Sequence, residues 1–206
     1  MLRRRMLRVA EHMPMNSMHR RLCSSTKWAD TVAQRLPLVL DRAALGDEVL
    51  EIGPGYGATT RVLAERIPHL TALEVDEMSA ARLAGQHDDV RIVHGSGTDM
   101  PLRDNGFSGV VCFTMLHHVP SPALQDELFA EAHRVLVPGG VFAGSDSQAS
   151  VRFRLLHIGD TMTVVSAATL PDRLAVAGFT DIEVEHEPKR IVRFWARKPA
   201  ERPQAV

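Results

Sequence analysis

Two acidic residues and a glycine-rich turn stand where two apolar segments end. Glu51 closes the first apolar segment, and Glu74 closes the second. Three glycines lie between them: Gly53, Gly55 and Gly57. Glycines between a strand and a helix let bare backbone N–H groups approach a ligand closely. A carboxylate at Glu74 can accept both hydroxyls of a ribose, so the pattern predicts a nucleotide or nucleoside site.

The neighbours of this turn indicate which nucleoside chemistry fits it. Pro54 lacks the N–H donor that a pyrophosphate would need, and the Glu51 carboxylate would repel a dianion. A ligand with a cationic amino group and a free ribose suits these charges better. The turn also reads loosely as G-x-G-x-x-A, with Ala58 last, which matches the dinucleotide fingerprint. An NAD(P)-dependent oxidoreductase therefore stays open as an alternative.

Alternating apolar and amphipathic segments predict the elements that hold this turn. A helical lead starts after the capping residues Ser24 and Ser25, and its apolar residues recur at helical spacing: Trp28, Val32, Leu36 and Leu40. We expect strands over residues 48–52, 70–75, 90–93, 109–114 and 141–144. Helices are expected over residues 58–66, 78–86 and 124–136, the last one stopped by Pro138, Gly139 and Gly140.

The end of the chain predicts a closing hairpin. A short helix ends at Gly178, and two alternating strands follow around Pro188 and Lys189. Together with the preceding βαβ order, this predicts the fold class α/β. We expect a Rossmann-like, doubly wound, mostly parallel seven-stranded sheet with a C-terminal antiparallel hairpin.

Four segments resemble, in this order, the class I S-adenosylmethionine-dependent methyltransferases. They are VLEIGPGYGATT at 49–60, ALEVDEMSAARL at 72–83, GSGTDMPLRDNGFSGVVCFTMLHHVPSP at 95–122 and RVLVPGGVFAGSD at 134–146. The resemblance is to the small-molecule branch (methyltransferase type 11), which includes the quinone-biosynthesis C-methyltransferases, and it extends from Trp28 to Pro199. It implies S-adenosyl-L-methionine as the cofactor.

The resemblance also implies which residues bind the cofactor. They lie at the carboxyl ends of the predicted strands, where open α/β sheets bind ligands: Glu51, Gly53, Gly55, Gly57, Glu74, Val75, Ser96, Gly97, Thr98 and Thr114. Two positions depart from the family, because Ser96 and Ser108 stand where many members carry Asp. The Ser96 hydroxyl can still accept a hydrogen bond from adenine. These departures leave a cofactor-binding protein without turnover as another alternative.

The end of the fourth predicted strand is expected to face the transferred methyl group and its acceptor. His117 and His118 follow this strand and are the candidate catalytic residues, since a histidine can take a proton from a phenol, enol or amine. The pair can equally cap a helix or hold the loop. Methyl transfer from a sulfonium is an in-line displacement, in which alignment and dehydration carry most of the rate.

Residues 147–167 form an unusually long connection at the ligand end of the predicted sheet, and we interpret it as a lid. Its apolar residues can wall an apolar or aromatic acceptor: Phe153, Leu155, Leu156, Ile158, Met162, Val164 and Val165. His157 and Asp160 are the polar candidates for orienting the substrate. Alternatively, these residues pack on the sheet.

Length and composition fit one globular domain. The chain has 206 residues, of which 45% are hydrophobic and 24% charged, and its formal net charge is −1, so no basic field indicates nucleic acid. We predict a basic, disordered arm over residues 1–22, a methyltransferase domain over 23–199 and a flexible tail over 200–206. No stretch has the length of a membrane span. Cys23 and Cys112 fit a reduced, cytoplasmic protein, and no metal site is expected.

A nucleic-acid acceptor is a further alternative. EIGPGYGATT and LEVD also resemble the rRNA adenine dimethylases. Those enzymes carry an Asn-x-Pro-aromatic motif after the fourth strand, where this chain has TMLHHV. The preferred interpretation is methyl transfer to a small, apolar or aromatic acceptor.

Overall fold

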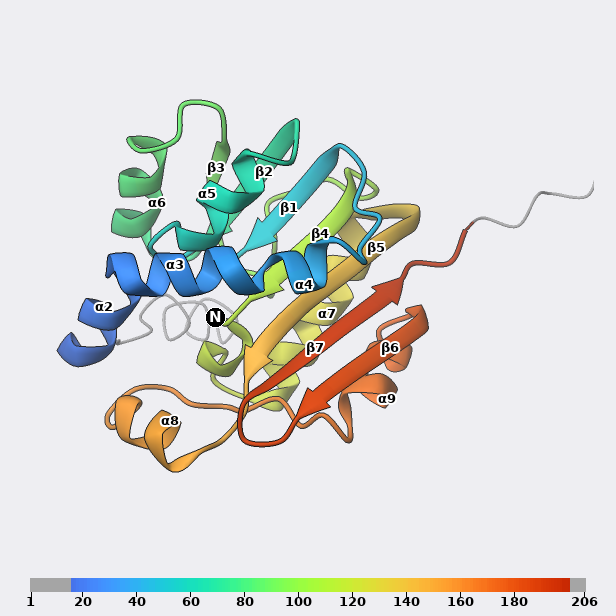
Figure 1. Cartoon of the computed structure of the whole chain (residues 1–206). Helices are drawn as coiled ribbons and strands as arrows, with labels where there is room; N and C mark the ends of the chain where they lie inside the picture. Colours follow the sequence, from blue (N-terminus) through green and yellow to red (C-terminus); the bar gives the residue numbers. More distant parts are fainter. Residues whose placement is uncertain (1–15, 201–206) are drawn as a thin grey trace, which may run out of the picture.

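A seven-stranded sheet forms the centre of the molecule, as the computed structural model of residues 16–200 shows (Figure 1). The strands are β1 (Glu48–Ile52), β2 (His69–Glu74), β3 (Arg91–His94), β4 (Phe107–Phe113), β5 (Leu136–Ser147), β6 (Thr180–Glu187) and β7 (Ile191–Arg197). Their order in the sheet is β3-β2-β1-β4-β5-β7-β6. The first five strands pair in parallel, whereas β7 is antiparallel to both β5 and β6. The predicted α/β sheet and its antiparallel hairpin are confirmed.

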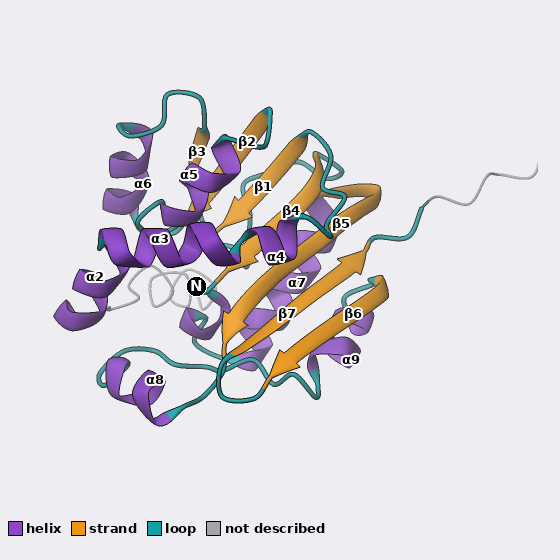
Figure 2. Ribbon diagram, in the orientation of Figure 1, coloured by secondary structure: helices purple, strands orange, loops and turns teal. Residues whose placement is uncertain are grey.

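Helices cover both faces of this sheet (Figure 2). They are α2 (Ser17–Cys23), α3 (Thr26–Arg35), α4 (Pro37–Leu40), α5 (Ala58–Ala64), α6 (Glu77–Ala84), α7 (Pro122–Val135), α8 (Val151–Leu156) and α9 (Leu170–Val176), and a 3₁₀ turn, η1, spans Leu116–His118. Among residues 16–200, no helix combines the length and the apolar character that crossing a membrane requires.

Alternation along the strands builds two cores. In β1, Val49 faces the core shared with α3, α4 and α5, while Leu50 and Ile52 face the core shared with α7 and α9. This is the period of two that a strand buried on both faces must follow. Phe142 of β5 packs against Phe129 of α7, with 6.1 Å between the ring centroids. The sheet is therefore held rigidly between two helical layers.

Two predicted boundaries need correction at the start of β5. Helix α7 ends at Val135, because Leu136 already has extended backbone angles, φ −71° and ψ 143°. Pro138, Gly139 and Gly140 do not stop the helix but lie within β5. The pairing of β4 with β5 shifts register there, between Phe107 and Gly109. The Pro-Gly-Gly sequence thus belongs to an irregularity of the strand.

The first described residues are helical and not disordered. Asn16 caps α2 by accepting a hydrogen bond from the His19 N–H at 2.9 Å. The prediction of a disordered arm over residues 1–22 is therefore wrong over 17–22, while residues 1–15 and 201–206 lie outside the described part of the chain. Ser25 caps α3 as predicted, accepting from the Trp28 N–H at 3.2 Å.

Candidate functional site

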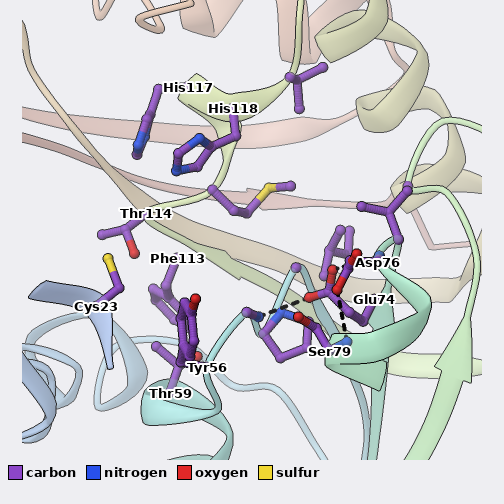
Figure 3. A pocket seen from close by; sticks show the side chains of 18 of the residues that line it. Cys23, Tyr56, Thr59, Glu74, Asp76, Ser79, Phe113, Thr114, His117 and His118 are labelled. Carbon is purple, nitrogen blue, oxygen red and sulfur yellow. Dashed lines mark hydrogen bonds between the residues drawn. The ribbon is translucent and has the colours of Figure 1, made fainter. Parts of the chain in front are cut away.

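A pocket of about 980 Å³ lies at the carboxyl ends of the parallel strands. The strand order reverses between β1 and β4, which is where open α/β sheets bind ligands. Figure 3 shows Glu74 and Asp76 at one end of this pocket and His117 and His118 at the other. We call the first the nucleoside end and the second the histidine end. The two ends differ in their chemistry.

The glycine turn opens the nucleoside end. The backbone φ angles of Gly53, Gly55 and Gly57 are 68°, 55° and 81°. Residues other than glycine rarely adopt such positive values. A Cβ on Gly57 would also lie 2.8 Å from the Leu83 side chain. The turn is braced by Arg82, whose Nη2 donates to the Gly55 carbonyl at 2.8 Å. The backbone is thereby fixed at the pocket wall.

Glu74 lies where β2 ends. Its carboxylate accepts the Gly55 N–H at 2.9 Å through Oε2 and the Asp76 N–H at 3.0 Å through Oε1. Burial raises the pKa of Glu74, while these backbone N–H groups oppose the rise. A carboxylate offers about four acceptor positions, so each oxygen keeps capacity for a ligand hydroxyl. Glu74 is oriented by the turn that it faces.

Glu51 lies behind the turn and does not line the pocket. Its Oε1 accepts the Thr59 hydroxyl, whereas its Oε2 is buried without a hydrogen-bond partner among residues 16–200. Burial raises the pKa of Glu51 to about 7. A buried carboxylate oxygen without a partner is costly and calls for an explanation.

The segment that the sequence predicts to contact the adenine presents two hydroxyl groups. Ser96 and Thr98 hydroxyls lie 2.9 Å apart, and the Thr98 N–H donates to Ser96 Oγ at 3.2 Å. Thr114, where β4 ends, has a φ of 52° and donates its N–H to the Ser145 carbonyl at 2.8 Å. This left-handed residue turns the chain from β4 into η1. It therefore aims the two following histidines at the pocket.

His117 is held by a buried carboxylate at the end of β5. Asp146 accepts the His117 backbone N–H at 2.7 Å and contacts its ring Nδ1 at 2.5 Å. Both side chains are almost inaccessible, at 3% and 0% exposure. The Ser147 N–H also donates to Asp146, at 2.7 Å. The Asp146 carboxylate thus fixes the orientation of the His117 ring through Nδ1, and Nε2 is the ring nitrogen that this contact leaves available.

Three further imidazoles surround His118 at this end. His19 of α2 lies with its ring centroid 5.2 Å from that of His118, and His157, which follows α8, lies at 5.6 Å. His117 stands at 4.2 Å. Burial, together with the neighbouring imidazoles, lowers the pKa of His118 to about 2. Burial also lowers the pKa values of His19 and His157, so the cluster favours neutral rings.

The long connection after β5 lies over the histidine end and is bonded to both η1 and α2. The Thr163 N–H donates to the His117 carbonyl at 2.7 Å. Gln125 Nε2 donates to the carbonyls of Leu116 and Thr163 at 2.9 and 2.8 Å. The side chain of Asn16, the N-cap of α2, donates to the Leu156 carbonyl at 2.7 Å. Its interpretation as a lid stays a prediction, and these contacts show what opening would have to break.

The structure brings most of the predicted site residues to one pocket. Those that line it are Gly53, Gly55, Glu74, Val75, Ser96, Gly97, Thr98, Thr114, His117, His118 and His157. Gly57 caps α5 and Glu51 is buried behind the turn. Asp160 is not at the pocket wall, because Asn16 and His19 occupy its carboxylate. The binding and catalytic roles of all these residues stay predictions.

Sequence reasoning missed several residues of the site, among them Asp146 and His19 at the histidine end. Asp146 carried a usable signal, since it ends a strand at the ligand edge beside the end of β4. His19 carried almost none, because only pairing with residues about 140 positions later brings it to the pocket. Ser108, a departure from the family, instead bridges the Glu48 N–H and carbonyl. Its side chain serves the sheet and not the pocket.

Residues 50–144 match a family model described as a methyltransferase domain. A ubiquinone biosynthesis O-methyltransferase from Hahella chejuensis is 35% identical over 111 residues, covering 51% of this chain and 45% of that protein. A ribosomal RNA small subunit methyltransferase A from Bordetella pertussis is 53% identical over 83 residues, covering 39% of this chain and 31% of that protein. The matches thus span less than half the length of either relative.

The fold also resembles a solved structure. A methyltransferase from Thermotoga maritima, described as S-adenosylmethionine-dependent, superposes with a TM-score of 0.68 at 17% identity. The match covers 88% of this chain and 98% of that chain. At this identity the likeness shows the fold alone.

Proposed function

We propose that this chain, which carries an S-adenosylmethionine-dependent methyltransferase domain matched over residues 50–144, methylates a small apolar or aromatic acceptor. The family match confirms the resemblance, which implies S-adenosylmethionine as the cofactor. One observation carries the proposal: the pocket joins a carboxylate and a bare backbone turn at one end to imidazoles and apolar side chains at the other. The oxidoreductase alternative is not favoured, because the matched family and relatives are methyltransferases.

The nucleoside end fits this cofactor. Glu74 would accept the ribose hydroxyls through the capacity that its backbone hydrogen bonds leave free. The unpartnered Oε2 of Glu51 suits the attraction of a cationic amino group beyond the turn. Ser96 and Thr98 would contact the adenine. When bound, S-adenosylmethionine supplies an electrophilic methyl group on a sulfonium.

The histidine end fits the acceptor. Thr114 and Met115 line the wall between the two ends, and Phe153 and Leu156 add apolar surface from α8. Such a dry wall holds a nucleophile close to the methyl group, at about 3–3.5 Å in a reactive pose. His117, oriented by Asp146, is the better placed of the two predicted histidines for accepting a proton from the acceptor.

The cofactor assignment is tested by calorimetric titration of the purified protein. We expect S-adenosylmethionine and its demethylated product to bind with one-to-one stoichiometry, and NAD to give no heat of binding. Binding of NAD alone would overturn the proposal. Binding of the cofactor without any methylated product from a broad acceptor panel would instead support the non-catalytic alternative.

The acceptor class is tested by transfer of a labelled methyl group. Phenols, quinols and other small aromatic compounds are compared with ribosomal RNA, since the local match to an rRNA methyltransferase favours RNA as the second candidate. We expect label only in the small molecules. His117→Ala should lower this turnover far more than it lowers cofactor affinity. Labelled RNA with unlabelled small molecules would replace the proposed acceptor.

A further inference from the structure

Three imidazoles converge at the histidine end from three separate parts of the chain. His19 comes from α2, His118 from η1 and His157 from the end of α8. Each offers a ring nitrogen, and these nitrogens all lie within 4.8 Å of one another. In a tetrahedral zinc site with Zn–N distances of about 2.0–2.1 Å, ligand nitrogens are separated by about 3.4 Å. Small side-chain rotations would bring the three nitrogens from the present separations to that distance.

The hydrogen bond of His157 fixes which nitrogen it presents. Its Nδ1 lies 2.8 Å from the Phe153 carbonyl, which can only accept, so Nδ1 carries the proton. In the neutral ring, Nε2 is then a bare lone pair. This Nε2 is buried and has no hydrogen-bond partner among residues 16–200, in a side chain that is only 4% exposed. A buried acceptor is normally paired with a hydrogen-bond donor or a cation, so the Nε2 lone pair indicates a ligand.

His19 is held in the arrangement that metal-binding histidines use. Its Nδ1 lies 2.9 Å from Asp160 Oδ2, and Asp160 is itself fixed by the Asn16 N–H at 2.6 Å. A carboxylate behind one ring nitrogen orients the ring and makes the other nitrogen a stronger ligand. The Asp160 side chain is almost fully buried, with an exposure of 1%. Asp160 therefore acts through His19.

We propose that His19, His118 and His157 bind one divalent first-row transition-metal ion, with Zn²⁺ as the ordinary occupant. Imidazole ligands suit Zn²⁺ and its neighbours, whereas Mg²⁺ and Ca²⁺ prefer oxygen. Three protein ligands leave a fourth position open. The three rings line the pocket, so this position is available to a molecule inside it.

The open position narrows the acceptor class, and this step rests on the proposed function. A metal ion at the histidine end would hold an acceptor through an oxygen or a sulfur, as in a phenol, an enol or a thiol. It would lower the pKa of that group and fix the nucleophile beside the wall formed by Thr114 and Met115. Acceptors without such a group would gain nothing from the ion.

The metal site is tested on untagged protein stripped with a chelator. Zn²⁺ is titrated in competition with a chromophoric chelator, Co²⁺ binding is followed by visible spectroscopy, and Mg²⁺ serves as the comparison ion. We expect one equivalent of Zn²⁺, a Co²⁺ spectrum typical of four-coordinate geometry and no competition by Mg²⁺. Absence of stoichiometric Zn²⁺ binding by the folded protein would overturn the proposal.

Variants locate the ion. Asp160→Asn should weaken Zn²⁺ binding about 10–100-fold, and His157→Ala should weaken it more. His157→Gln, which keeps a polar side chain of similar length, repeats the test if the alanine variant unfolds, as judged by circular dichroism. His186→Ala, at an exposed position of β6, is the matched control and should leave affinity unchanged. Folded His157 variants with unchanged affinity would place the ion elsewhere and contradict the proposal.

The same samples separate this proposal from the proposed function. Cofactor binding is titrated with and without Zn²⁺. A protein that binds S-adenosylmethionine but no Zn²⁺ keeps the proposed function and loses the metal site. A protein that binds Zn²⁺ but no S-adenosylmethionine does the reverse.

Discussion

The two ends of the pocket are built in opposite ways. The nucleoside end comes mainly from one stretch, residues 51–76, to which residues 96–98 add two hydroxyls, and it presents backbone groups and one oriented carboxylate. The histidine end joins α2, η1, the end of β5 and the residues after α8, and presents side chains. Local sequence therefore determines the first end, whereas the second exists only when distant segments pack together.

This difference predicts that the two ends can be damaged separately. Changes that share no contacts usually have additive effects on the free energy of unfolding. Substitutions at either end therefore test that independence.

Asp146→Ala should be the most damaging change. It removes the buried acceptor of the His117 and Ser147 N–H groups and leaves both unsatisfied. We expect the free energy of unfolding to fall by about 3–5 kcal/mol, measured by urea denaturation. Asp89→Ala, at an exposed position before β3, should change it by less than about 0.5 kcal/mol.

The same variant sharpens the comparison between the ends. Because Asp146 contacts the histidine end, the fraction that remains folded should keep its affinity for S-adenosylmethionine. A parallel collapse of cofactor affinity in the folded protein would mean that the two ends form one unit.

Glu51→Gln tests the charge at the nucleoside end through pH. Burial raises the pKa of Glu51 from 4.5 to about 7, so between these values the folded state binds more protons than the unfolded state. Stability therefore falls as the pH rises through this window, and the loss is complete above pH 7. The free energy of unfolding of the variant, relative to that of the native protein, should be higher at pH 8 than at pH 4 by on the order of 2–3 kcal/mol.

Glu48→Gln is the control for this measurement, since Glu48 is exposed at the start of the same strand. Its difference from the native protein should not change over the same pH range. Equal effects of Glu51→Gln at both pH values would show that the Glu51 carboxylate is not responsible.

Glu74→Ala addresses cofactor binding directly. Losing a charge-assisted hydrogen bond to the ribose should weaken binding by about 1.5–3 kcal/mol, as measured by calorimetry. Zn²⁺ affinity at the histidine end should not change. Glu77→Ala, an exposed acid in the first turn of α6, provides the comparison. Unaltered cofactor affinity in Glu74→Ala would remove the ribose assignment.

Arg82→Ala should have the smallest effect of the four. It removes the hydrogen bond to the Gly55 carbonyl and the contact of the guanidinium with the Tyr56 ring, 4.4 Å from its centroid. The glycine turn would become less ordered, and cofactor affinity should fall by about 1 kcal/mol. Arg61→Ala, exposed on α5, should bind normally. A full loss of binding would give Arg82 a direct role.

Sequence reasoning succeeded where the determinants are local. The bounds of β1 were predicted correctly, because an apolar run bounded by a glycine turn permits few alternatives. The start of β5 was misplaced, since Pro138 and Gly139 lie in an irregular part of the strand, where Gly139 and Gly140 form backbone hydrogen bonds with the distant Lys198. The family resemblance supplied the cofactor, and most of the cofactor-binding residues that it implied line the pocket.

The histidine end shows the limit of that approach. No periodicity links His19 to His157, and their meeting depends on hydrogen bonds from the Asn16 side chain to the carbonyls of Leu156, where α8 ends, and of Ile158. A pattern within one segment carries no information on such a contact. For the same reason, nothing in the sequence indicated that Asp160 lies behind His19.

The place of β7 within the sheet has a consequence for synthesis. Among the described strands it is the last to be made, yet it lies between β5 and β6. Until the ribosome has released residues 191–197, the long edge of β5 is open and β6 has no neighbour to pair with. Such an edge invites aggregation of nascent chains. Chaperone demand should therefore peak just before this segment emerges, and chains interrupted there should accumulate as aggregates.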